Sequence, residues 1–129
     1  MNRNIRDADL IITKAIPAQN TNENSSALTL GATFPENAQV EVAIPATPSL
    51  ANGQTITVAL QDSADNASFA AIPELATLVV TGAGGTGGPA ATRTVHLPPS
   101  ARKFIRMNIA ASATAGNNTA VSATMGLLF

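Results

Sequence analysis

The sequence contains no cysteine, no tryptophan and no tyrosine, and its only aromatic residues are four phenylalanines. Without cysteine the chain has no disulfide framework, no thiol nucleophile and no thiolate metal site. Without Trp or Tyr it lacks the flat side chains on which sugar rings and nucleic-acid bases usually stack. These absences argue against thiol enzymes, zinc ribbons and aromatic binding platforms.

Charge is also scarce, because only 12% of the residues are Asp, Glu, Lys or Arg, about half the usual share. The charges are unevenly placed: residues 1–74 carry 3 − 8 = −5, whereas residues 75–129 carry +4 and no acidic residue. Patches of opposite sign favour a polar contact with a second copy or with a larger protein surface. The alternative is that the strand faces merely differ in charge.

The 129 residues are enough for one domain with a thin core, because Ala and Thr outnumber large apolar residues. A domain with little margin over its conformational entropy often gains stability by association, which predicts a homo-oligomer, either a dimer or a trimer. No apolar run approaches the roughly 18 residues of a membrane span. The first 16 residues lack the apolar core of a secretory signal.

The apolar residues that are present follow the period of a β-strand. Clear alternation occurs at 39–44, 55–61 and 103–109, and helical periodicity is absent. About eight such runs, separated by turn signals, predict an all-β antiparallel jelly roll or β-sandwich. The predicted inward residues are Val40, Val42, Ile56, Val58, Leu60, Val95, Ile105, Met107, Ile109, Val121 and Met125.

A literal G-x-G-x-x-G occurs at Gly82, Gly84 and Gly87. A dinucleotide fingerprint needs a following helix and an acidic residue about 20 positions later. Pro89 and a β-branched stretch follow instead, and no acid occurs after Glu74. The motif therefore predicts a flexible loop between strands, and no cofactor is expected.

Two other patterns point away from catalysis and metal binding. Asp62, Asp65 and Asn66 lie in the turn DSADN, which lacks the spacing of a calcium loop, so these side chains are expected to bond to the turn backbone. His96, the single histidine, has no Ser, Asp or Glu beside it in sequence to orient it as a base. The sequence predicts no catalytic, cofactor-binding or metal site, and we expect that the protein is not an enzyme.

Arg102, Lys103 and Arg106 form a basic cluster. Nucleic-acid binders usually combine such a cluster with stacking aromatics and a strongly basic domain. This chain has a pI near 5.6 and a single aromatic residue nearby, Phe104. The cluster therefore favours contact with an acidic protein surface over nucleic acid.

Three stretches together resemble the jelly-roll cement (decoration) proteins of tailed-phage capsids. The strand TITVALQ enters a turn of the form Q-x-S-x-D-N-x-x-F, the run RKFIRMNI gives a later strand, and TAG with a terminal V-S-A-x-M strand closes the chain. The resemblance covers residues 39–129. It implies a structural protein on the outer surface of a virion, which binds the major capsid protein and stabilises contacts between capsomers. It provides no catalytic residues.

A carbohydrate-binding or host-attachment module of a virion is the alternative, since jelly rolls commonly bind sugars. It is disfavoured by the absence of Trp and Tyr. Membrane and nucleic-acid partners are not expected under either interpretation.

Residues 1–26 are predicted to form an extended N-terminal arm, followed by a β-sandwich domain over residues 27–129. An apolar run at 10–12 is flanked by basic residues and followed by the Asn-rich stretch QNTNENSS. We expect this arm to add a strand to another subunit or to capsid protein, unless it is a disordered tail. Removal of residues 1–24 should then leave the β domain folded. The predicted contact residues are Arg3, Arg6, Leu10, Ile12, Lys14, Arg102, Lys103 and Arg106.

Overall fold

The computed structural model describes residues 6–29, 39–72, 77–96 and 104–128, which contain ten β-strands and no helix. No helix in these residues has the length and apolar character to span a membrane. The strands are β1 (Arg6–Ala15), β2 (Asn22–Asn24), β3 (Leu28–Thr29), β4 (Gln39–Ile44), β5 (Thr55–Ser63), β6 (Ala70–Ala71), β7 (Leu78–Thr81), β8 (Ala91–His96), β9 (Phe104–Ala111) and β10 (Ser122–Leu128).

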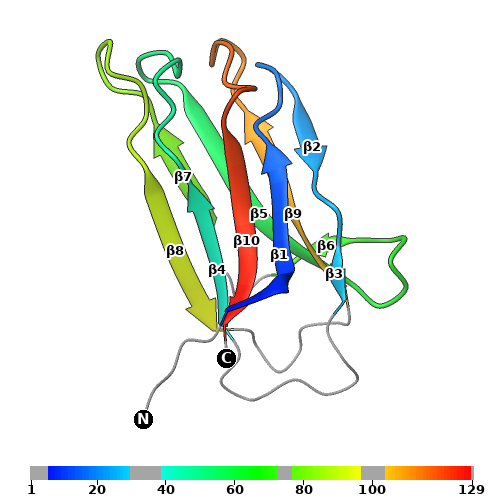
Figure 1. Cartoon of the computed structure of the whole chain (residues 1–129). Coiled ribbons are helices and arrows are strands. Elements are labelled where there is room, and N and C mark those ends of the chain that lie inside the picture. Colours follow the sequence, from blue (N-terminus) through cyan, green and yellow to red (C-terminus); the bar gives the residue numbers. More distant parts are fainter. Residues whose placement is uncertain (1–5, 30–38, 73–76, 97–103, 129) are drawn as a thin grey trace.

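The strands form two antiparallel sheets (Figure 1). Sheet A has the order β1-β10-β4-β8. In sheet B, β9 pairs with β5, the short strands β2 and β3 share the outer edge of β9, and β6 and β7 share the outer edge of β5. Each sheet is therefore four strands wide.

The pairing is nested along the chain. The first strand pairs with the last (β1 with β10), β2 and β3 pair with β9, β4 pairs with β8, and β5 pairs with β6 and β7. This folded-over ribbon of strand pairs is a jelly roll. The predicted fold class is confirmed.

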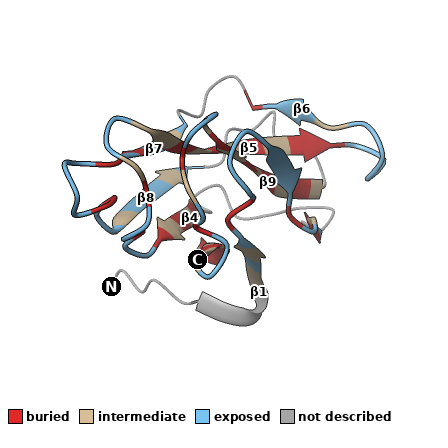
Figure 2. Ribbon diagram, turned by 90° about the horizontal axis from the view of Figure 1, so that it is seen from above, coloured by how far each residue is buried: buried red, intermediate tan, exposed pale blue. Residues whose placement is uncertain are grey.

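The core lies between the two sheets, as the period-2 pattern requires. Buried and half-buried residues alternate along β4, β5 and β9. In Figure 2 the buried residues, drawn red, lie along these strands, whereas the connecting loops are largely exposed. Nine of the eleven predicted inward residues are buried, and Val95 and Val121 are half-buried and pack against the core.

The N-terminal segment is part of the sandwich, which corrects the expectation of a separate arm over residues 1–26. β1 pairs antiparallel with β10, with Ile12 opposite Met125, and Ile16 is only 1% exposed. β2 pairs with β9, and Ser25 is buried beside it. The pairing with β1 satisfies the backbone hydrogen-bonding groups on the second edge of β10. The isoleucines of this segment also lose contact with water when they cover the core. Residues 1–5 lie outside the described part of the chain.

Candidate interaction surfaces

The structure describes only part of the predicted contact set. Arg3, Arg102 and Lys103 lie outside the described residues. The backbone of Arg6 and Leu10 belongs to β1, and Ile12 on the same strand packs against the core. Ile12 is therefore half-buried against the core of its own chain.

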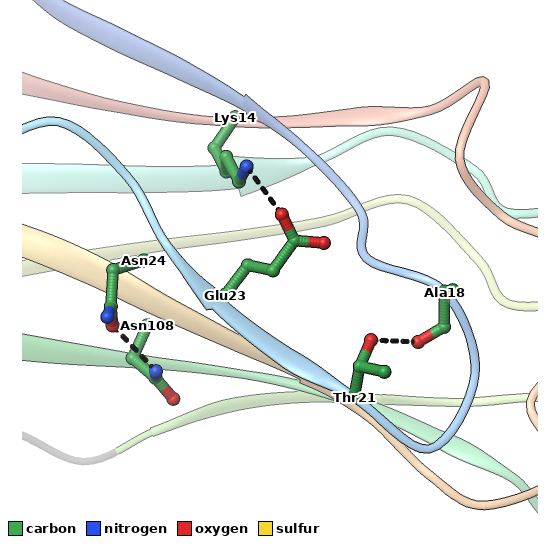
Figure 3. A network of polar contacts seen from close by, with 6 residues as sticks. All are labelled: Lys14, Ala18, Thr21, Glu23, Asn24 and Asn108. Atoms are coloured by element: carbon green, nitrogen blue, oxygen red, sulfur yellow. Dashed lines mark hydrogen bonds and ion pairs between the residues drawn. The ribbon is translucent and has the colours of Figure 1, made fainter.

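Lys14 is held within its own chain (Figure 3). Its Nζ lies 2.9 Å from Oε1 of Glu23 on β2, which belongs to the other sheet. Lys14 is paired with the buried Ala123 and Glu23 with the buried Ile109, so both side chains are on the inward faces of their strands. This ion pair closes the side of the sandwich where β1 and β2 are the edge strands.

Two further bonds fasten β2 and the residue after it to β9. Asn108 Nδ2 donates a hydrogen bond to Asn24 Oδ1 at 2.8 Å, and the Met107 backbone N–H donates to Ser25 Oγ at 2.9 Å (Figure 3 shows the Asn pair). The Lys14–Glu23 pair contributes about 1 kcal/mol or less, because it is partly exposed. These polar contacts fix the positions of the edge strands β1 and β2 more than they stabilise the fold.

Arg106 is also engaged within the chain. Its position between the buried Ile105 and Met107 places it on the outward face of sheet B. Its Nε donates to Gln61 Oε1 at 2.9 Å, and its guanidinium carbon lies 3.8 Å from the centre of the Phe69 ring. A cation over an aromatic face is favourable, so Arg106 holds the 64–69 loop against β5 and β9.

Arg93 on β8 was not among the predicted contacts, yet its position resembles that of Lys14. It is paired with Val42, whose side chain is buried, so Arg93 lies on the inward face of an edge strand. It lines a small gap between the sheets together with Val58, Leu60 and Leu78. The sequence indicates this position, because Arg93 lies two residues before Val95 and therefore on the same face of the strand, where an apolar residue is expected.

Four loops converge at one end of the sandwich, at the top of Figure 1. They connect β1 to β2 (16–21), β4 to β5 (45–54), β7 to β8 (82–90) and β9 to β10 (112–121). None of these residues is charged or aromatic; they are mainly Ala, Gly, Thr, Ser, Asn and Pro. We call this surface the uncharged loop end.

Hydrogen bonds join the four loops to one another. Thr47 and Gly88 exchange two backbone bonds of 2.9 and 2.8 Å, which link the second loop to the third. The Ala51 N–H donates to the Ala115 carbonyl at 3.1 Å, and the Gly116 N–H donates to Gln19 Oε1 at 3.0 Å. The uncharged loop end is therefore a bonded layer and not a set of independent loops.

The glycines of the G-x-G-x-x-G stretch serve this packing. The stretch connects strands, as predicted, and no helix follows it in the described residues. A Cβ on Gly82 would lie 2.2 Å from the Ala51 carbonyl oxygen, and one on Gly87 would lie 2.2 Å from the Thr47 carbonyl oxygen. These glycines permit close backbone approach between two loops, and hydrogen bonds join the stretch to the 45–54 loop.

Asp65 of the DSADN turn bonds to the turn backbone, as expected, whereas Asp62 is a buried residue of β5. Asp65 Oδ1 accepts hydrogen bonds from the Ala67 and Ser68 N–H groups, both at 3.0 Å, and from Ser63 Oγ at 2.8 Å. The bonds from Ser68, Ala67 and Ser63, in that order, lower the pKa of Asp65 from 3.8 to about 2. Among the described residues no three His, Asp or Glu side chains gather as metal ligands would.

The depressed pKa of Asp65 predicts a pH effect. Its contribution to stability is present above the ordinary value of 3.8 and is lost as the pH falls toward about 2. We expect Asp65→Asn to be less stable than the parent protein at neutral pH, and this difference to shrink across that interval. Urea unfolding of both proteins at several pH values measures it. A difference that is constant with pH would show that the charge of Asp65 is irrelevant.

Comparison with solved structures gives an informative likeness. No family model matches the sequence, and no curated protein resembles it significantly. The crystal structure of the PBSX exported protein XepA is similar to this chain, with a TM-score of 0.58 and 13% sequence identity over 90% of this chain. The matched region is 35% of XepA, so this chain spans about a third of that protein's length. At this identity the likeness shows a shared β-sandwich fold.

Proposed function

We propose that this protein is a structural cement (decoration) protein that binds the outer surface of a phage icosahedral capsid. It would stabilise contacts between capsomers of the major capsid protein and catalyse no reaction. The jelly-roll topology and the phage origin of the structural neighbour XepA support a virion protein. Fold alone does not determine function, so the proposal depends on a surface suited to such binding.

The uncharged loop end is the observation that carries the proposal. Its small side chains have little rotamer entropy to lose on contact, and its bonded loops are already ordered before binding. The absence of charge means that a close contact leaves no buried unpaired ion. A rigid, small-residue, neutral surface fits closely against a broad protein shell.

Charge insertion at this surface tests the proposal. We expect Ala46→Glu and Ala113→Glu, both at exposed loop positions, to weaken binding to purified shells of the encoding phage by about tenfold or more, because each buries a carboxylate. Co-sedimentation with the shells measures bound protein.

The matched control is Ala64→Glu, which adds the same charge at an exposed position in the loop after β5, away from the uncharged loop end. This variant should bind as the parent does. Absence of shell binding by the parent protein, or equal binding by all three variants, would refute the proposal.

A sugar-binding module is the second candidate, and a hollow in the uncharged loop end is the observation that favours it. The hollow is lined by Ala18, Gln19, Gly116 and Asn117, whose two amide side chains are groups that bond to sugar hydroxyls. It has no aromatic wall on which a pyranose ring would stack. A glycan array distinguishes the two: reproducible binding that Gln19→Ala removes would favour this candidate.

A further inference from the structure

The strands at the sides of the two sheets carry backbone groups that no described strand pairs with. Sheet A ends in β1 and β8, and the sides of sheet B are formed by β2 with β3 and by β6 with β7. A row of unpaired N–H and C=O groups is a template for pairing with another chain, and proteins protect such edges in recognisable ways.

Three of these four sides are interrupted. In sheet B each side strand has only two to four residues, so few backbone groups lie in line. In sheet A the register of β1 with β10 shifts between Arg6 and Ile11, and the ion pair of Lys14 with Glu23 ties β1 to the opposite sheet. Short strands and irregular register both hinder the addition of a strand.

β8 differs from the other side strands because its edge is regular. All six of its residues pair in unbroken register with β4, which is its one sheet neighbour among the described strands. Its sequence ATRTVH contains three β-branched residues and no proline. By its backbone alone, β8 would accept an added strand through main-chain hydrogen bonds.

Arg93 interrupts the apolar inward face of this strand. It is paired with the buried Val42, so it shares the inward face of β8 with Ala91 and Val95. The small gap that it lines is otherwise formed by valines and leucines of both sheets. In the part of the chain that the structure describes, no hydrogen bond or ion pair engages its guanidinium, and the residue is exposed. Its charge is therefore in contact with water at the open side of the sandwich.

A strand added beyond β8 would take this charge out of water. Leu78 of β7 is paired with the buried Val58, lines the same gap from the opposite sheet and offers no side-chain acceptor. No residue after Glu74 is acidic, so neither β7 nor β8 supplies a carboxylate. Burial of a cation without a partner is strongly unfavourable. Two β8 strands from two copies would also bring two such cations into one sheet, which adds like-charge repulsion.

We infer that Arg93 protects the β8 edge, because its inward-facing charge prevents this edge from pairing with the β8 edge of a second copy. An inward-pointing charge on an edge strand is one of the means by which β-sheet proteins avoid edge-to-edge association. Copies that associate, as the thin core predicts, then meet at another surface. The inference concerns a sheet edge and is independent of the shell binding proposed above.

Removal of the charge tests the inference. We expect Arg93→Gln and Arg93→Thr to raise the association constant of the full chain by about tenfold or more over that of the parent, because pairing of β8 no longer buries a cation. Gln keeps a polar side chain, and Thr already occupies two other positions on β8. Sedimentation equilibrium over a concentration series measures association, and circular dichroism verifies that each variant is folded.

The matched control is Arg106→Gln, which removes the same charge from the outward face of sheet B. Its net charge equals that of Arg93→Gln, so a difference between these two variants is due to the position of the charge. The control should associate as the parent does. Arg93→Lys keeps an inward charge and should also behave as the parent.

Hydrogen exchange at low and high protein concentration locates the contact. In the associated Arg93→Gln protein, backbone amides within residues 91–96 should exchange more slowly than in its monomer, because the free edge of β8 becomes hydrogen-bonded. In the parent protein the exchange of these amides should not depend on concentration.

Four results would overturn the inference. The first is that neither neutral variant at residue 93 associates more than the parent, and the second is that Arg106→Gln associates as strongly as Arg93→Gln. The third is association of the neutral variants that leaves exchange at residues 91–96 unchanged. The fourth is a parent protein in which association already slows exchange at these residues.

Discussion

Deletion of residues 1–24 is expected to prevent folding of the domain. The deletion removes β1 and β2, including Ile16 at 1% exposure and the half-buried Ile12, and it uncovers Met125 and Ala123 on β10. Burial of one isoleucine contributes about 1.5–3 kcal/mol, and the whole domain has a stability of about 5–15 kcal/mol. The deletion also removes the hydrogen bonds that join β1 to β10 and β2 to β9, so the total loss is comparable with that stability. This outcome is the reverse of what the arm interpretation implied.

The measurement is a thermal or urea unfolding curve, in which the truncated protein should show no cooperative transition. Deletion of residues 1–5 alone, which precede β1, is the control and should preserve a transition. If the protein without residues 1–24 unfolds cooperatively at a temperature close to that of the parent, the pairing of β1 with β10 contributes little and the arm interpretation is restored.

Gly87→Ala is expected to be the most damaging single substitution in the loops. Gly87 has a φ of 74°, where a side chain costs about 1–2 kcal/mol. A Cβ would also lie 2.2 Å from the Thr47 carbonyl oxygen and 2.5 Å from Pro48 Cα. The loops must separate to relieve this contact, which breaks the two Thr47–Gly88 backbone bonds. The sum is about 3 kcal/mol or more, which lowers the Tm by about 10 °C or more.

Gly85→Ala separates the two causes. Gly85 has a similar φ of 85°, but no heavy atom lies within 4 Å of a Cβ built there. Its substitution should cost only the backbone term of about 1 kcal/mol, or about 4 °C in Tm. Scanning calorimetry of both variants measures the difference. Equal losses would mean that the loops are not in the close contact described.

The strand pattern of the sandwich could be predicted because it is local. Alternation in β4, β5 and β9 identifies inward residues such as Val40, Ile56 and Ile109 without knowledge of their partners. The bonding of Asp65 within its turn was equally predictable, since its partners lie within three residues. Both features depend on neighbours in the sequence.

The place of β1 could not be predicted, because its partner β10 lies at the other end of the sequence. Short polar segments beside an apolar run fit a free arm as well as an edge strand. The role of Gly82 was hidden for the same reason: the Ala51 backbone that it accommodates belongs to another loop. The lack of charge in four loops was visible in the sequence, but only the topology brings those loops to one end.

The position of β10 between β1 and β4 constrains how this chain folds during synthesis. β10 follows the other nine described strands in the chain, so it leaves the ribosome after them, and it fills an interior position of sheet A. Until it emerges, β1 lacks its partner and β4 lacks one of its two neighbours, so their apolar faces and free edges are open to other nascent chains. Closure by such a distant pairing is slow compared with hairpin formation. Translation through residue 128 is therefore a prerequisite for completing sheet A, and a chain stalled before β10 is an aggregation hazard.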